Sequence, residues 1–254
     1  MEPLSPRQQS ILNRVVDRYI ETAHPVGSRL ITELYTELYR DSYSPATARH
    51  EMGLLEAMGY LTQPHTSAGR VPTDLGYRYY VDHGLRPENF SGNFIQQLTR
   101  DLMGGTLETV DETFANEISR ILSRLSGEAG LVMSAQKRPP TLAFQGASHM
   151  LEKPEFQDVQ KVRMIIQTFE EKEPLMDWLT QRISFQGVVV TIGRENEPEA
   201  FRDCAVVSAG YSIGGARRGV LAILGPRRMN YSRIVPLVSQ MGRILERILD
   251  SASE

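Results

Sequence analysis

Apolar residues recur at helical spacing three times within the first sixty positions of this chain. The first stretch begins at Ser5-Pro6 and keeps apolar residues three and four positions apart, which predicts an amphipathic helix. Residues 24–27 (His-Pro-Val-Gly) end it, and Ser28 can cap a second helix. A third helix is predicted to begin at Ser44-Pro45 and to end at Gly59. The apolar face of the first helix consists of Ile11, Leu12, Val15, Val16, Tyr19 and Ile20.

The pattern then changes to that of a short hairpin. Residues 60–63 and 70–71 are typical of two short strands, and residues 65–69 (His-Thr-Ser-Ala-Gly) are typical of the turn between them. Three helices followed by a hairpin is the element order of a winged helix-turn-helix. A further short helix near residues 73–82 is expected to pack one of Tyr77, Tyr79 and Tyr80 onto this bundle.

Residues that interrupt regular structure are concentrated between positions 83 and 93, and they predict a linker after a first domain of residues 1–82. Residues 94–126 return to helical spacing, with a weak point at Gly104-Gly105. This region is therefore expected to form one connecting helix or two, and it is our first candidate for a dimer seam. Its apolar positions are Leu98, Leu102, Leu107, Val110, Phe114, Ile118, Ile121 and Leu125.

Residues 127–254 alternate between the two kinds of pattern, which predicts a mixed α/β domain with a regulatory or oligomerisation role. The complete chain is thus expected to be of the α+β class, with a winged helix-turn-helix, a helical connector and a mixed domain. The expected strands are residues 130–134, 187–192, 205–209 and 220–224, and the expected helices are residues 159–169, 174–183 and 232–249.

Composition narrows the class of protein. The chain has 254 residues, of which 41% are hydrophobic and 23% charged, as in globular proteins of two compact domains. Its start lacks the pattern of a signal peptide, and no apolar run has the length of a membrane span, so we expect a cytoplasmic protein. A single cysteine, Cys204, excludes a disulfide framework and a cysteine-cluster metal site, and no cofactor is expected.

Charge argues against a nucleic-acid partner at first sight. The net charge is −3, and the first 82 residues contain eight Arg and no Lys against ten acidic residues. A basic surface would therefore have to be local. On a helical wheel of the third helix, Thr47, Arg49 and His50 lie away from the apolar side, which carries Ala48 and Met52. Such an outward face, small at some positions and hydrogen-bonding at others, is typical of a helix that reads the major groove.

Arg70 is expected to supply charge from the hairpin. It follows a flexible tip, has no role in a core and has no acidic partner nearer than Asp74, so it is predicted to reach a phosphate or the minor groove. A salt bridge to Asp74 is the alternative. Each residue taken singly also fits an ordinary cap, turn or solvated position. The candidate DNA-binding residues are Ser44, Thr47, Arg49, His50, Thr66, Ser67, Gly69, Arg70 and Arg78.

Six segments of the chain closely resemble the heat-inducible transcription repressor family HrcA. The resemblance covers the first domain and continues into the last, which it identifies as GAF-like. The segments are residues 44–52 (Ser-Pro-Ala-Thr-Ala-Arg-His-Glu-Met), 55–61, 63–74 (Gln-Pro-His-Thr-Ser-Ala-Gly-Arg-Val-Pro-Thr-Asp), 76–82, 150–156 (Met-Leu-Glu-Lys-Pro-Glu-Phe) and 219–229.

The resemblance implies a homodimer that binds an inverted repeat in double-stranded DNA upstream of chaperone operons and represses them. It also implies that chaperonin helps to keep the repressor active. The chain departs from the family between residues 134 and 146, where a short bridge replaces a longer segment that includes an inserted dimerisation domain. How a shortened member dimerises is therefore a question for the structure.

Two strings resemble enzyme motifs, and both lack their partners. The run Gly-Tyr-Ser-Ile-Gly around Ser212 would need a following helix and a downstream histidine, and no histidine follows His149. Ser134 and Lys137 match a serine acylase pattern, but Pro139-Pro140 prevent the helix that this pattern needs. We expect no catalytic residues. A repressor that responds to a small ligand in the GAF-like domain, bordered by residues 212–218, is the alternative function.

Overall fold

The computed structural model describes residues 3–39, 44–65, 68–102, 110–136, 140–184 and 186–251. The chain divides into two compact units, Met1–Arg86 and Pro87–Glu254, and each is considered by itself. Within these ranges, no helix combines the length and the apolar character needed to cross a bilayer.

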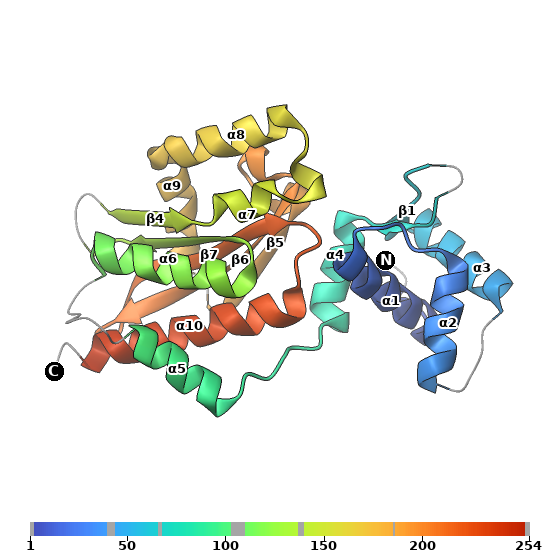
Figure 1. Ribbon diagram of the computed structural model, residues 1–254, viewed down its shortest axis with the longest axis horizontal. Coiled ribbons are helices and arrows are strands. Elements are labelled where there is room, and N and C mark those ends of the chain that lie inside the picture. The colour runs from blue at the N-terminus through green and yellow to red at the C-terminus, as the bar shows by residue number, and fades with distance from the viewer. Residues whose placement is uncertain are drawn as a thin grey trace. The chain divides into compact units, whose positions relative to one another are not determined.

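The first unit has the predicted order of three helices and a hairpin (Figure 1). The two strands pair antiparallel, with Leu61 opposite Pro72 and Thr62 opposite Val71. The last helix continues into a π-helical turn, η1. The elements are α1(Pro6–Thr22), α2(Ser28–Tyr39), α3(Pro45–Ala57), β1(Leu61–Thr62), β2(Val71–Pro72), α4(Asp74–Tyr79) and η1(Tyr80–Gly84).

Local signals decide where these helices begin and end. The Ser5 hydroxyl accepts from the Gln8 amide while the Gln8 side chain accepts from the Ser5 amide, a capping box that confirms the predicted start of α1. Gly59 follows α3 with a positive φ of 83°, a conformation that glycine adopts without strain. The core beneath the helices is apolar and is closed by Tyr77 and Tyr80, as the sequence predicts. It includes Ile11, Leu12, Val15, Val16, Ile31, Ala48, Met52 and Leu55.

The second unit is an antiparallel sheet between helices, in the strand order β4-β3-β7-β6-β5. Its helices are α5(Gly92–Leu102), α6(Glu112–Ser126), α7(Ala147–Leu151), α8(Val159–Glu170), α9(Lys172–Ile183) and α10(Tyr231–Ser251), with the short turns η2(Pro154–Phe156), η3(Gly193–Glu195) and η4(Glu199–Phe201). Its strands are β3(Ala129–Ser134), β4(Thr141–Gln145), β5(Val188–Ile192), β6(Cys204–Ile213) and β7(Ala216–Pro226).

Helices cover both faces of this sheet (Figure 1). Alternate residues of β3 face opposite sides of the sheet. Leu131 and Met133 belong to the core under α8 and α9. Gly130 faces the other side and packs against the backbone of α6 at Ser119. The middle of each central strand is therefore mostly apolar, as in Val206–Val207 of β6 and residues 220–224 of β7. This arrangement confirms the predicted α+β class with a GAF-like second unit.

Two features of the second unit differ from the sequence-based expectations. The bridge after β3 contains a strand, β4, whose five residues pair with β3 and were not predicted. The apolar stripe proposed as a dimer seam is also buried within the unit, and its α6 part packs onto the chain's own sheet. The seam hypothesis is wrong for Leu98, Leu102, Val110, Phe114, Ile118 and Ile121, which are all buried, while Leu107 lies outside the described residues.

The segments of residues 150–156 and 219–229 meet in a group of ion pairs. Lys153 pairs with the buried carboxylate of Glu128, which directly precedes β3, and Arg228 pairs with Glu155. Burial raises the pKa of the Glu128 carboxyl to about 7, against the lowering effect of Lys153. These contacts connect the start of β3, η2 and the residues after β7, so the two segments have a structural role in the second unit.

The serine of the Gly-Tyr-Ser-Ile-Gly run lies in a strand. Ser212 is near the end of β6, and the hairpin turns at Gly214 and Gly215, both with positive φ, before β7 begins. The Ser212 amide donates to Glu246 and the Gly214 amide to Asp250, both on α10. The predicted turn between two strands is confirmed, and the strand-turn-helix of a nucleophile elbow does not form at this serine.

Candidate nucleic-acid interface

Arg49 and His50, two of the predicted DNA-binding residues, lie on the outward side of α3. Ala48, Met52 and Leu55 are buried against the bundle, so the helix turns Ala46, Arg49 and His50 toward solvent. The exposed side chains are a methyl group, a guanidinium and an imidazole. This face can therefore present donors, an acceptor and a small apolar surface to a partner.

Ser44 and Thr47 form the start of the helix. The Ser44 hydroxyl accepts from the Thr47 amide at 3.1 Å, and the two hydroxyl oxygens are 3.0 Å apart. Ser44 is thus an N-cap, as predicted. Thr47 is half-buried and its hydroxyl already has a partner, so its free contact surface is mainly the methyl group.

Gly53 extends the same side of α3, one turn beyond His50. A Cβ atom at this position would meet no atom within 4 Å, so no close contact within the described chain requires glycine here. Glycine inside a helix costs about 1 kcal/mol relative to alanine. A surface without side chains next to Arg49 and His50 is what a closely approaching partner would need.

The hairpin is attached to the corner between α1 and α2. The Val26 amide donates to the Arg70 carbonyl and the Arg70 amide donates to the Val26 carbonyl, each at 2.9 Å. Gly69 lies directly against this corner, since a Cβ there would be 2.5 Å from the Val26 oxygen and 2.8 Å from the Gly27 nitrogen. The close approach of two backbones explains this glycine without any contact to DNA.

The expectation that Arg70 lacks a nearby acidic partner is wrong. Its Nε donates to Glu56 Oε2 at 2.9 Å, and a terminal nitrogen lies 2.8 Å from the same oxygen. Only 18% of the Arg70 side chain is exposed. The partner is Glu56 near the end of α3 and not Asp74, because the fold brings the base of the hairpin over that helix.

A surface hollow of about 390 Å³ joins three parts of the first unit. Arg49 enters it from α3, Ser28 from the first residue of α2, and Arg70 from the hairpin. Two guanidinium groups beside the amides of a helix start form a surface that favours an anion. We call it the wing hollow; its lining is Val26, Gly27, Ser28, Arg49, Gln63, Ala68, Gly69 and Arg70.

Three of the predicted site residues line the wing hollow, namely Arg49, Gly69 and Arg70. Arg78 lies on α4 and pairs with Asp82 at 3.1 Å. Thr66 and Ser67 fall outside the described residues. Ser28, Gln63 and Glu56 were not predicted as site residues. The Gly27-Ser28 pair at the start of α2 is a signal that could have indicated Ser28.

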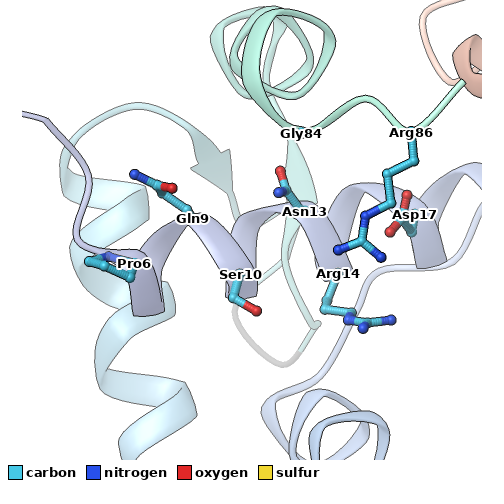
Figure 2. Close-up of a pocket in the computed structure, with 8 residues that line it drawn as sticks. All are labelled: Pro6, Gln9, Ser10, Asn13, Arg14, Asp17, Gly84 and Arg86. Atoms are coloured by element: carbon cyan, nitrogen blue, oxygen red, sulfur yellow. The ribbon is translucent and has the colours of Figure 1, made fainter. Parts of the chain in front are cut away.

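A second hollow, of about 230 Å³, lies on the polar side of α1 (Figure 2). Arg14 and Arg86 extend beside Asp17, and Asn13 is directed at Gly84, where a Cβ would be 2.2 Å from the Asn13 oxygen. Burial raises the pKa of Asp17, although a hydrogen bond from Tyr80 and the two arginines act in the opposite direction. Both hollows have two arginines with a carboxylate nearby. Asp17 itself lines the second hollow, whereas Glu56 is not part of the lining of the wing hollow, so the second hollow is less suited to an anion.

The described ranges give no indication of a metal site or of a reactive thiol. They contain no group of three or more His, Cys, Asp or Glu placed to hold a metal ion. Cys204 is buried in the sheet, and burial raises the pKa of its thiol to about 12. A thiol that stays protonated at neutral pH is a core residue and not a nucleophile.

Comparison with known proteins gives one consistent family. A family model described as the HrcA protein C-terminal domain matches residues 81–235. The heat-inducible transcription repressor HrcA of Shouchella clausii is 30% identical, with 97% of this chain and 98% of that protein aligned. The repressor of the same name from Pelotomaculum thermopropionicum is also 30% identical, with 97% of each chain covered.

The Shouchella clausii alignment spans 345 positions, whereas this chain has 254 residues, so at least 91 aligned positions have no residue here. One solved structure, described as a hypothetical protein at 2.2 Å resolution, has a TM-score of 0.74 and 18% identity. The superposition covers 98% of this chain and 99% of that protein, so the two share the same fold.

We predict that Gly69→Ala destabilises the protein by about 1 to 3 kcal/mol, because the new methyl group overlaps the Val26 carbonyl. Gly27→Ala is the matched control, since a Cβ at Gly27 meets nothing within 4 Å. Its free energy of unfolding should change by less than about 1 kcal/mol. Urea denaturation of the two variants decides the matter, and equal stabilities would mean that the close approach at Gly69 has no energetic weight.

Proposed function

We propose, since this chain belongs to the HrcA family of heat-inducible transcription repressors, that it represses chaperone operons by binding an inverted repeat in their upstream DNA. The observation that supports this most directly is full-length similarity to named repressors in a chain whose third helix exposes Arg49 and His50. The family is one of transcription repressors and not of enzymes.

In this proposal α3 enters the major groove and His50 and Thr47 meet base edges. The exposed imidazole of His50 can donate to or accept from a base, and the Thr47 methyl can contact a thymine methyl. Ala46 and Gly53 have small side chains or none, so the DNA can approach this side of the helix closely. Ser44 and the amides of the helix start would lie near a phosphate.

The wing hollow is proposed to receive a DNA phosphate. Arg49 is exposed at its edge, and the start of α2 contributes amide donors. Arg70 is paired with Glu56 in the free protein, with 18% and 34% of the two side chains exposed. A phosphate would take the place of the Glu56 carboxylate as the anion beside the guanidinium, so the ion pair is compatible with a role in DNA binding.

A homodimer is part of the proposal because one winged helix contacts one half-site, and an inverted repeat calls for two-fold symmetry. The segment that the family inserts after residue 134 would lie between β3 and β4, which are neighbouring antiparallel strands. A short connection closes such a pair without loss of the sheet. The dimer contact must use surfaces other than the buried stripe of α5 and α6.

We further propose that chaperonin helps to keep the repressor active, as the family resemblance implies. Adding chaperonin to a DNA-binding assay should raise the fraction of active repressor. The apparent affinity of repressor that is already active should stay the same.

We predict that His50→Ala and Thr47→Ala weaken binding to the inverted repeat by about 1 to 3 kcal/mol, because each loses a base contact. The probe is the inverted repeat upstream of the chaperone operon in the genome that encodes this chain. Binding to a scrambled duplex of equal length should be unchanged. His83→Ala, which removes an exposed histidine from η1, is the control, and equal losses on both duplexes would exclude base readout by α3.

We predict that Arg70→Ala lowers the slope of log affinity against log salt by about one unit, because one phosphate contact is lost. Glu56→Gln should strengthen binding, because it frees the Arg70 guanidinium. The gain in affinity should be much smaller when Glu56→Gln is combined with Arg70→Ala. If Glu56→Gln strengthened binding only by removing a negative charge, the double variant would show the same gain.

Arg120→Ala is the matched control for these titrations, since Arg120 pairs with Glu117 on α6 in the other unit. It should leave the affinity and the slope unchanged. If Arg70 only supports the hairpin through Glu56, both Arg70→Ala and Glu56→Gln will weaken binding, and the phosphate contact is then refuted.

We predict two chains per inverted repeat and one chain pair in free solution. Light scattering of the protein with and without the duplex measures both masses. A monomer in both samples would exclude binding of the inverted repeat by a symmetric dimer. The contacts proposed for α3 could then still be tested with a duplex that contains one half-site.

A further inference from the structure

Arg182, near the end of α9, carries a buried charge without a counter-ion. Within the described ranges only two charged residues are buried, Glu128 and Arg182. Glu128 has Lys153 as its partner, whereas no described carboxylate forms an ion pair with Arg182, which is 5% exposed. A buried charge left uncompensated is strongly unfavourable, so Arg182 calls for an explanation.

The partners of this guanidinium are neutral. One terminal nitrogen donates to the Ser208 hydroxyl of β6 at 3.4 Å, and the other to the Thr191 hydroxyl of β5 at 3.1 Å. The guanidinium carbon lies 4.1 Å from the ring centroid of Trp178, one helical turn earlier on α9. Arg182 Nε is buried and has no hydrogen-bond partner among the residues that the structure describes. Of the five N–H donors of an arginine, several remain free.

The surrounding groups are held in place by hydrogen bonds of their own. The Thr191 hydroxyl lies 2.7 Å from Asn196 Oδ1, to which it donates. The two N–H groups of the Asn196 amide are in turn shared among the carbonyls of Gly193, Phe201 and Cys204. Asn196 is therefore fully engaged and fixes Thr191. The guanidinium is held in one orientation, and none of its hydrogen-bond partners carries a negative charge.

The acidic residue that acts electrostatically on Arg182 is Glu197, which is exposed and forms no ion pair with it. Burial lowers the pKa of the guanidinium to about 10, and the attraction of Glu197 offsets only part of this effect. Arg182 nevertheless stays charged at neutral pH. The cation–π contact with Trp178 and two hydroxyl oxygens compensate less than a carboxylate would.

We propose that Arg182, together with Thr191 and Ser208, is a binding site for the carboxylate of a small organic acid, located between α9 and strands β5 and β6. The carboxylate accepts from Arg182 Nε and from a terminal nitrogen, in the two-point geometry that arginine offers to planar anions. Thr191 is half-buried at the edge strand β5, so the guanidinium lies one side chain below the surface there.

Charge balance favours a monocarboxylate over a phosphate. One negative charge neutralises the single buried cation, whereas a doubly charged phosphate would leave an uncompensated negative charge in an apolar region. Trp178, Phe201 and Leu179 fill the neighbouring core with the chain's own side chains, so a small acid suits the site better than a bulky one. This site goes beyond the proposed repression of chaperone operons and does not depend on it.

Trp178 provides a direct readout, because it is the only tryptophan in the chain and lies under Arg182. The full-length protein is titrated with sodium acetate, butyrate and benzoate at constant ionic strength, with sodium chloride as the blank and inorganic phosphate as the competing anion. Acetate should produce a saturable change in Trp178 fluorescence, and butyrate and benzoate show how large an acid the site accepts. Benzoate binding is read by calorimetry because this acid absorbs. Chloride and phosphate should produce no saturable change.

The variants Arg182→Met and Arg182→Lys test the assignment. Arg182→Met should abolish the response and keep or raise the melting temperature of the ligand-free protein, because it removes an uncompensated charge. Arg182→Lys keeps a charge, loses the two-point contact and should weaken binding at least about tenfold. Arg163→Met, at an exposed arginine of α8, is the matched control and should behave like the wild type.

Three results would overturn the proposal. The first is that no carboxylate produces a saturable signal in the wild type. The second is that the signal persists in Arg182→Lys and, if that variant folds, in Arg182→Met. The third is that phosphate alone produces the signal. DNA binding is not part of this readout, so a failure here leaves the repressor function standing, and failure of the repressor function leaves this site testable.

Discussion

The reciprocal backbone hydrogen bonds between Val26 and Arg70 are the constraint on which the candidate interface depends. They hold the base of the hairpin on the corner between α1 and α2, and this contact leaves no space for a side chain at Gly69. The same contact directs the Arg70 side chain over the end of α3, where it meets Glu56. The wing hollow exists because these three parts of the chain are joined at one point.

Features of the first unit that depend on neighbouring residues could be predicted from the sequence. The capping box at Ser5 and Gln8, the N-cap at Ser44 and the positive φ of Gly59 each involve residues a few positions apart. The partner of Arg70 could not, because Glu56 is 14 positions away and on another element. Helical periodicity identifies the outward side of α3, but it does not show which residues of other elements lie beside it.

The second unit shows the limits of apolar spacing more clearly. The stripe that includes Phe114 and Ile118 has the same spacing whether it packs on a partner helix or on the chain's own sheet, and it does the latter. Strand β4 was missed because its five residues closely follow Pro139-Pro140 in the sequence, and because apolar spacing does not show its pairing with β3. At least 91 positions of the Shouchella clausii alignment have no residue in this chain, and the family resemblance places the extra segment between β3 and β4.

Arg70 and Arg182 show how burial decides what an arginine can do in a chain of net charge −3. Arg70 lies near the surface with a carboxylate at 2.8 Å, so its charge is already balanced and a phosphate has to displace Glu56. Arg182 is buried with hydroxyl partners and an aromatic ring, so an anion would relieve a cost that the fold now carries. An anion exchanged at Arg70 lies near the surface, where salt screens charges, whereas an anion at Arg182 would lie in the interior, where screening is weak. The first property suits reversible DNA binding in one unit, and the second suits retention of a small acid in the other.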